Sequence, residues 1–450
     1  MERSHCQIGT PTNIYKPGLS RLFRPLALGV VGGCALLSSG EAALAEGFVD
    51  DSKLTLTLRN YYFSSDRANR RANQQDWTQG FLMDYQSGFT QGTVGVGVDA
   101  FGYLGLKLDG GPGRRGTGNL PVHAGNEPAD EYSRAGAAVK LRVGKTVVRY
   151  GQQAPSAPVF AISTSRLFPQ TATGWSVVSA DVADLMMEAG HFTSATDQVS
   201  TNRDGDLWAG YARRRAASID FAGGKYSPVK GVSVSLYGAQ LDNIWNQYYG
   251  NLNLVKALSS TQSLTFDANL YHTVDTGKAN AGPIDNTSYS LAAAYTQGPQ
   301  TFTLGWQKIN GDTPADYVGM GDNNRLGSGL LLGNAVMFSD FNAPNERSWQ
   351  ARYDLNFKTL GVPGLSLMTR YIKGTDIDGS GLPANSAYRG LYGADDRERE
   401  LDLEGRYVLQ SGAAKGLSIR VRQAWHRGSP STGGSVDQLR LIVDYPLRLL

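Results

Sequence analysis

Arginine side chains recur on one face of several segments in which apolar and polar residues alternate. Arg420 and Arg422 are two residues apart, and Arg406 and Arg440 hold the same polar positions in neighbouring segments. Residues two apart in a β-strand point to the same face and lie about 6.6 Å apart. A guanidinium group binds a carboxylate through two hydrogen bonds and keeps its charge. The spacing therefore predicts a row of carboxylate-binding groups. Each group binds a solute weakly enough for the solute to move to the next one.

Three further cations extend this row. Lys140 and Arg142 repeat the two-residue spacing, and Arg59 has the same alternation phase in the first such segment. Pairing of the first and last segments in a closed sheet would bring Arg59 near Arg440. The alternative interpretation is that these cations only stiffen the wall by pairing with acidic residues: Asp99, Asp402, Glu404 and Asp444.

The alternating segments themselves define the elements that position these side chains. Apolar and polar residues alternate at 54–59, 94–99, 139–144, 349–357 and 417–422. Segments of about 9–11 residues with aromatic residues near their ends are typical of tilted membrane-spanning strands. Because a lipid-facing arginine costs about 2–4 kcal/mol at the bilayer midplane, the cations should face a water-filled lumen. The fold class predicted is all-β, a transmembrane antiparallel β-barrel of about 16 to 18 strands.

The N-terminus indicates export. Two arginines precede an apolar stretch at 25–37, and an A-x-A cleavage signal ends at Ala45. We therefore expect a cleaved signal peptide at 1–45 and one barrel domain at 46–450, carried through the periplasm to the bacterial outer membrane. A weaker alternative is a lipoprotein signal at Cys34. Both cysteines precede the cleavage point, so a disulfide scaffold is excluded.

Charge balance and connection lengths narrow the function further. The 43 basic and 40 acidic residues give a formal net charge of +3, which predicts no general attraction to nucleic acid.

The connections between the predicted strands differ in length. Short connections such as 361–364 alternate with long polar ones such as 374–396. The connection at 151–184 is unusual, because it carries three prolines and the apolar run 159–162. A long loop with apolar content should pack against something, so we expect it to fold into the lumen and constrict the pore.

Several stretches resemble one known family along nearly all of residues 46–450. Residues 58–63, 77–81, 165–174, 339–342 and 440–447 are similar to the OprD-type outer-membrane porins, also called outer-membrane carboxylate channels. The resemblance at 165–174 is closer to the basic-amino-acid branch than to the aromatic-carboxylate branch. It implies an 18-stranded barrel, monomeric or loosely trimeric, with a narrow eyelet. The implied function is passive uptake of small carboxylate-bearing nutrients, such as basic amino acids or short peptides, in contact with outer-membrane lipids.

The resemblance also implies particular eyelet residues. Tyr211 and Asp340 fall at positions on the acidic side of the eyelet, facing the arginine row. Arg166 lies in the expected inward loop. It is either an eyelet cation or a side chain that holds the loop by bonding backbone carbonyls.

Other functions remain as alternatives. The barrel could admit aromatic or other monocarboxylates, or act as a general porin with a wide lumen. An outer-membrane serine peptidase would need a Ser-His-Asp triad. His191 is the nearest candidate histidine, but no serine has the sequence context of a nucleophile, so a structural histidine is the preferred interpretation. We expect no enzymatic activity, no cofactor and no metal, because residues 46–450 hold no cysteine and no H-x-x-x-H spacing.

Overall fold

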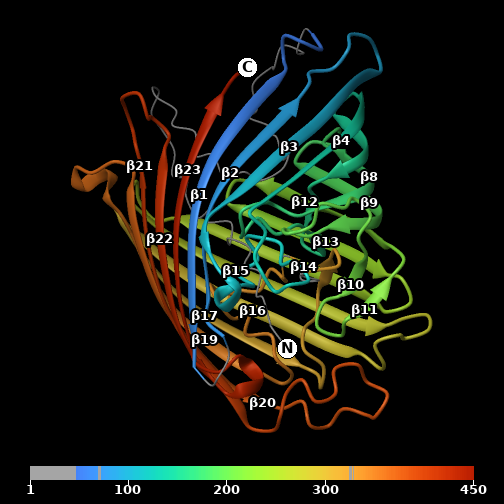
Figure 1. Ribbon diagram of the computed structural model, residues 1–450, viewed down its shortest axis with the longest axis vertical. Helices are drawn as coiled ribbons and strands as arrows, with labels where there is room; N and C mark the ends of the chain where they lie inside the picture. Colours follow the sequence, from blue (N-terminus) through green and yellow to red (C-terminus); the bar gives the residue numbers. More distant parts are fainter. Residues whose placement is uncertain (1–46, 69–71, 324–326, 328) are drawn as a thin grey trace.

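The chain folds into a closed β-barrel. The computed structural model describes residues 47–68, 72–323, 327 and 329–450, so the leader expected at 1–45 lies outside the described residues. Within those residues, 18 antiparallel strands form one sheet, drawn as a tilted wall in Figure 1. Each strand pairs with the next along the chain, and β1 (Lys53–Arg67) closes the ring against β23 (Val436–Arg448). The predicted all-β barrel is thereby confirmed.

The other barrel strands are β2 (Gln74–Gln86), β3 (Gly95–Gly110), β4 (Glu131–Val143), β5 (Thr146–Gln153), β8 (Thr171–Ser179), β9 (Leu185–Thr196), β12 (Ile219–Val229), β13 (Val232–Leu241), β14 (Trp245–Ala257), β15 (Gln262–Asp275), β16 (Asp285–Gln297), β17 (Gln300–Asn310), β19 (Arg347–Asn356), β20 (Leu365–Ile377), β21 (Asp396–Val408) and β22 (Ser418–Gly428). Two small sheets lie in the connections: β6 (Ser156–Ala157) with β7 (Phe160–Ala161), and β10 (Leu207–Ala209) with β11 (Arg214–Ala216) and β18 (Val318–Met320). Three short 3-10 turns are η1 (Pro112–Arg114), η2 (Phe357–Leu360) and η3 (Pro430–Thr432). Among the described residues, no helix is long and apolar enough to cross a membrane.

Alternation along each strand separates the two faces of the wall. On β4, Val139 and Leu141 are 53% and 44% exposed, whereas Ala138 and Lys140, which alternate with them, are 3% and 5% exposed. Successive side chains of a strand point to opposite faces, so the apolar set faces outward and the polar set faces the interior. The lysines and arginines of the predicted row therefore point into the lumen.

Connections at the two ends of the barrel differ in length. Gly144 and Lys145 alone join β4 to β5, and Gly144 has a φ of +59°, a left-handed conformation that favours glycine in tight hairpins. At the other end, longer connections run over residues 111–130, 197–218 and 311–346. Short turns at one end and long loops at the other are typical of outer-membrane barrels.

The boundaries predicted for the inward loop need correction. Residues 146–153 form β5 and residues 171–179 form β8, so the connection comprises only residues 154–170 and not 151–184. Trp175 and Val177 point outward and alternate with inward residues, a strand pattern that the nearby prolines obscured in the sequence.

A buried apolar core lies inside the barrel. It joins side chains of the long connections to inward-facing side chains of β9 to β17. Its members include Phe160, Phe192, Leu207, Ile219, Trp245, Tyr271, Ile309, Met320 and Tyr388. The interior beside these strands is therefore filled with packed side chains, while the cations of the predicted row lie mainly on β1 and β21 to β23.

Candidate functional site

The segment of residues 154–170, here called the first inward segment, crosses the barrel interior. The Tyr61 hydroxyl on β1 donates to the Ser165 carbonyl at 3.0 Å, and the Tyr271 hydroxyl on β15 donates to the Pro158 carbonyl at 3.0 Å. β1 and β15 lie on nearly opposite sides of the ring. The segment is thus tied to two facing walls, which confirms the expected inward fold.

Residues 330–343, here called the second inward segment, follow the inner wall. The backbone N–H of Gly333 donates to Ser290 Oγ on β16 at 2.9 Å, and that of Asn334 donates to Gln307 Oε1 on β17 at 2.9 Å. Further along, Arg440 Nη2 on β23 donates to the Met337 carbonyl at 3.0 Å. The resemblance placed Asp340 at the eyelet, but sequence reasoning missed the course of this segment along the wall, because the side chains that hold it come from distant strands.

Two arginines of the predicted row, Arg420 and Arg422, share one carboxylate, and a third, Arg406, lies beside them. Arg422 Nε lies 3.0 Å from Glu404 Oε2, and Arg420 Nε lies 3.9 Å from Glu404 Oε1. Arg406 stands directly opposite Arg420 in the strand register and donates to Ser418 Oγ at 3.1 Å. The Arg420 side chain is 34% exposed and that of Arg422 is 12% exposed, so Arg420 is the more accessible to a solute.

Arg440 and Arg166 lie against the same aromatic ring and hold main-chain carbonyls. Their guanidinium carbons are 5.3 Å and 5.2 Å from the centroid of Phe63. Arg440 is 2% exposed. Arg166 donates to the carbonyls of Thr117 at 2.7 Å and Ser165 at 3.1 Å. Of the two interpretations of Arg166, this geometry matches the one in which it holds the loop. Arg440 likewise holds an inward segment and is buried. It therefore differs from the accessible carboxylate-binding cation that the sequence predicted.

Arg59 is positioned by the closure of the barrel. The first and last strands pair as expected, but the register sets Arg59 opposite Asp444 and Phe63 opposite Arg440. Arg59 Nε lies 2.7 Å from Asp444 Oδ1, and Arg59 Nη1 donates to the Arg166 carbonyl at 3.0 Å. Arg59 therefore binds the first inward segment and does not stand beside Arg440.

Lys140 and Arg142 form a separate group on β4. Lys140 Nζ lies 2.5 Å from Asp99 Oδ1 and donates to the Ser87 carbonyl at 2.9 Å. The Arg142 guanidinium carbon is 4.4 Å from the ring centroid of Phe89. The structure does not bring these two cations together with those of β21 to β23.

Tyr211 and Asp340 meet as the acidic side of the predicted eyelet. The Tyr211 hydroxyl lies 3.4 Å from Asp340 Oδ2 and 3.2 Å from Asn342 Oδ1. Asp340 is 4% exposed. Burial raises the pKa of Asp340 to about 7, although the hydrogen bond from Tyr211 acts to lower it. The carboxyl group therefore changes charge near neutral pH.

A second buried carboxylate, which sequence reasoning missed, fixes the main chain at Tyr211. Asp316 accepts hydrogen bonds from the backbone N–H of Tyr211 at 2.9 Å and of Ala212 at 3.1 Å. It also accepts one from the Tyr388 hydroxyl at 3.0 Å. Burial raises the pKa of Asp316 to about 6 against these hydrogen bonds. The Asp316 side chain thus joins three connections, at 197–218, 311–346 and 378–395.

The histidine considered for catalysis lies on the outside of the wall. His191 Nδ1 is 2.7 Å from Asp220 Oδ1, and both side chains are about half exposed. Its neighbour Phe192 points into the buried core. In the part of the chain that the structure describes, no group of three or more His, Cys, Asp or Glu side chains could hold a metal ion.

Comparisons with known proteins agree on one family. The family model described as "outer membrane porin, OprD family" matches residues 46–449. Porin D of Pseudomonas aeruginosa is 53% identical over 435 residues, covering 94% of this chain and 98% of that protein. The crystal structure of P. aeruginosa OprD superposes with a TM-score of 0.80 at 52% identity, covering 90% of this chain and 97% of that one. P. aeruginosa OpdK, solved with vanillate, gives a TM-score of 0.77 at 34% identity, covering 89% and 100%.

Proposed function

The chain belongs to the OprD family of outer membrane porins, and we propose that it admits small carboxylate-bearing solutes, in particular basic amino acids and short peptides. The observation that carries this proposal is the course of the second inward segment. Met337 is bonded to Arg440 on the cationic wall, and three residues later Asp340 meets Tyr211. Cationic and acidic groups therefore border one short stretch of chain, which suits a solute that has both a carboxylate and a cation.

The path along the wall would begin at the most accessible arginines. Arg420 and Arg422 share one carboxylate, Glu404, and Arg406 lies opposite Arg420, so the positive charge of this group is only partly neutralised. A solute carboxylate can bind such a partly neutralised cation and leave it again without being held tightly, which conduction requires. The two inward segments would narrow the pore beside this wall and force the solute past it.

Single-channel conductance in planar bilayers tests this path. We expect arginine and glutamate to block the current of the wild-type protein, and an Arg420→Ala/Arg422→Ala double variant to lose most of the block. A Lys140→Ala/Arg142→Ala double variant removes two cations from a separate part of the wall and serves as the matched control. If arginine, glutamate and benzoate leave the current unchanged in every protein, the row is structural and the protein is a general pore.

A second candidate function is a channel for aromatic or other monocarboxylates. The burial of Asp340 favours this second function, because a residue that is 4% exposed offers little direct contact to a solute cation. The similarity to OpdK, which was solved with vanillate, agrees with it. An Asp340→Asn variant separates the two functions: reduced block by arginine with unchanged block by benzoate supports the first, and no change in either supports the second.

We also propose that residues 1–45 are removed on export. The family model begins its match at residue 46, next to the cleavage signal that ends at Ala45. N-terminal sequencing of the protein extracted from outer membranes tests this, with Glu46 as the expected first residue. A lipid-modified Cys34 at the N-terminus would instead support the lipoprotein alternative.

A further inference from the structure

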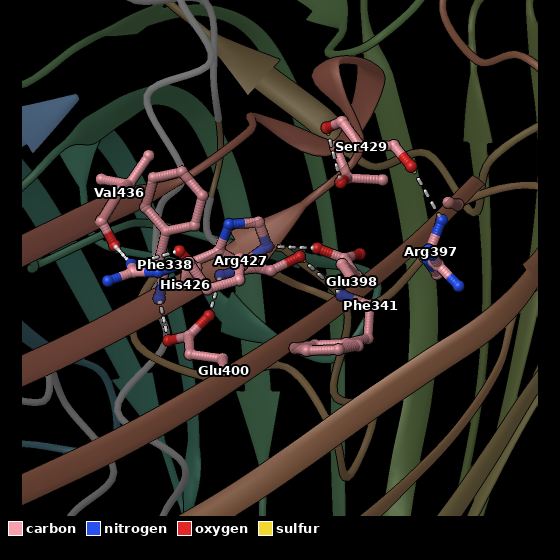
Figure 2. Close-up of polar contacts among 12 residues, drawn as sticks. Phe338, Phe341, Arg397, Glu398, Glu400, His426, Arg427, Ser429 and Val436 are labelled. Atoms are coloured by element: carbon pink, nitrogen blue, oxygen red, sulfur yellow. Dashed lines mark hydrogen bonds and ion pairs between the residues drawn. The ribbon is translucent and has the colours of Figure 1, made fainter. Parts of the chain in front are cut away.

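One buried carboxylate on the barrel wall binds the main chain of the second inward segment. Glu400 Oε1 accepts a hydrogen bond from the backbone N–H of Phe338 at 2.7 Å, and Oε2 accepts one from that of Ser339 at 2.9 Å. Glu400 is fully buried on β21. Figure 2 shows its carboxylate reaching the main chain beside Phe338. Two consecutive N–H groups thus point at one carboxyl group, so both oxygens of Glu400 are used as acceptors.

Neighbouring contacts clamp the same stretch from both sides. Asp402 Oδ2 lies 3.4 Å from the backbone N–H of Met337, and Arg440 Nη2 donates to the carbonyl of that residue. The residue that follows this clamped stretch is Asp340, whose carboxyl group meets the Tyr211 hydroxyl. The place of Asp340 along the channel is thus determined by main-chain bonds to the wall at residues 337 to 339.

We propose that Glu400 is the positioning residue of the constriction, which sets the place of Asp340 and thereby the preference for solutes that carry a cation. This inference rests on the proposed function. Each oxygen of the Glu400 carboxyl group accepts from one of two consecutive N–H groups, and a buried donor left without a partner is costly. No cation-bearing solute needs to touch Glu400, because Glu400 acts through the segment that it holds.

The substitution Glu400→Gln tests this with a small change of shape. A glutamine offers one acceptor oxygen to two N–H donors and points its own NH₂ group at the second donor. We expect a folded barrel in which the ratio of block by arginine to block by glutamate falls several-fold. The slower migration of heated relative to unheated protein in SDS gels confirms folding. If Glu400→Gln does not fold, Glu400→Asp keeps the carboxyl group but retracts it from the two N–H donors, and the same fall in the ratio is expected.

Glu398 provides the matched control. It lies two residues before Glu400 on the same face, is 4% exposed, and bonds His426 Nε2 at 2.8 Å (Figure 2). The negative charge of Glu398 raises the pKa of Asp340, so Glu398→Gln should favour ionised Asp340. We therefore expect Glu398→Gln to keep or increase the preference for arginine, whereas Glu400→Gln lowers it.

A double-variant cycle decides whether Glu400 acts through Asp340. The double variant Glu400→Gln/Asp340→Asn should show no larger fall in the ratio than Asp340→Asn alone. The proposal is overturned if Glu400→Gln keeps the wild-type ratio, if Glu398→Gln loses the ratio equally, or if the two losses multiply in the double variant. A wild-type protein that is blocked equally by arginine and glutamate would instead refute the proposed preference for basic amino acids, and the inference with it, while loss of block in Arg420→Ala/Arg422→Ala would still support the carboxylate path.

Discussion

At the scale of single residues, the acidic partner decides what each cation of the wall can do. Alternation in the sequence predicted which side chains face the lumen, but not which of them are paired. The strand register settles the pairing: Arg59 meets Asp444, Lys140 meets Asp99, and Arg422 meets Glu404. Register depends on pairings between distant strands, so the stiffening role of Arg59 and the exposure of Arg420 could not be predicted from one sequence.

We expect block of the current by arginine to depend on pH through the charge of Asp340. Its pKa is about 7, so the carboxyl group is mostly neutral below that pH and ionised above it. Block of the current by arginine should therefore strengthen as the pH rises from about 5 to about 9. Conductance measurements across this range check the prediction. Asp316 also titrates, at a pKa of about 6, so an Asp340→Asn variant is needed as the control and should show a much flatter profile.

The raised pKa of Asp340 also affects how the stability of the fold depends on pH. The direction is opposite to that of a salt-bridged acid, whose pKa is lowered on folding. A carboxyl group whose pKa is raised on folding holds a proton that the unfolded chain releases, so folding is disfavoured as the pH rises. The contribution of Asp340 is complete below its unfolded pKa of about 4 and is lost as the pH approaches 7. Asp340→Asn should reduce the alkaline loss of thermal stability. An unchanged pH profile of the unfolding temperature would contradict this.

At the scale of elements, the two inward segments differ in how far the sequence revealed them. Prolines and the apolar run at 159–162 predicted the first inward segment, although β8 had to be removed from its range. The second inward segment also has apolar runs, at 330–332 and 335–338, but its course is set as well by polar side chains of β16, β17, β21 and β23. Contacts of that kind leave no periodic pattern in a sequence.

The attachment of the first inward segment can be tested at each of its ends. Tyr61→Phe removes the hydrogen bond to Ser165, and Tyr271→Phe removes the bond to Pro158 together with one from the backbone N–H of Leu331. Each change should destabilise the segment by about 0.5–1.5 kcal/mol and increase the current fluctuations of the open channel. Single-channel noise analysis measures this effect. Tyr62→Phe, next to Tyr61 but on the outward face, is the control, and equal noise in Tyr61→Phe and Tyr62→Phe would refute the attachment.

At the scale of the whole molecule, stability depends on the seam between β1 and β23. Arg59 joins the two strands of this seam to the interior, because it binds Asp444 across the seam and the Arg166 carbonyl inside. Asp444→Asn leaves the largely covered guanidinium without its ion partner, which should cost about 1.5–3 kcal/mol. The temperature at which the folded band disappears in SDS gels should fall. An unchanged temperature would show that backbone pairing alone holds the seam.

The first inward segment also acts as a cross-brace of the barrel. It is bonded to β1 and to β15, which lie nearly opposite one another in the ring, and its Phe160 belongs to the core inside the barrel. A ring held only by pairing between neighbouring strands can flatten without breaking those pairs. A segment bonded to facing walls opposes that change of shape, so the same residues that narrow the lumen also keep its cross-section constant.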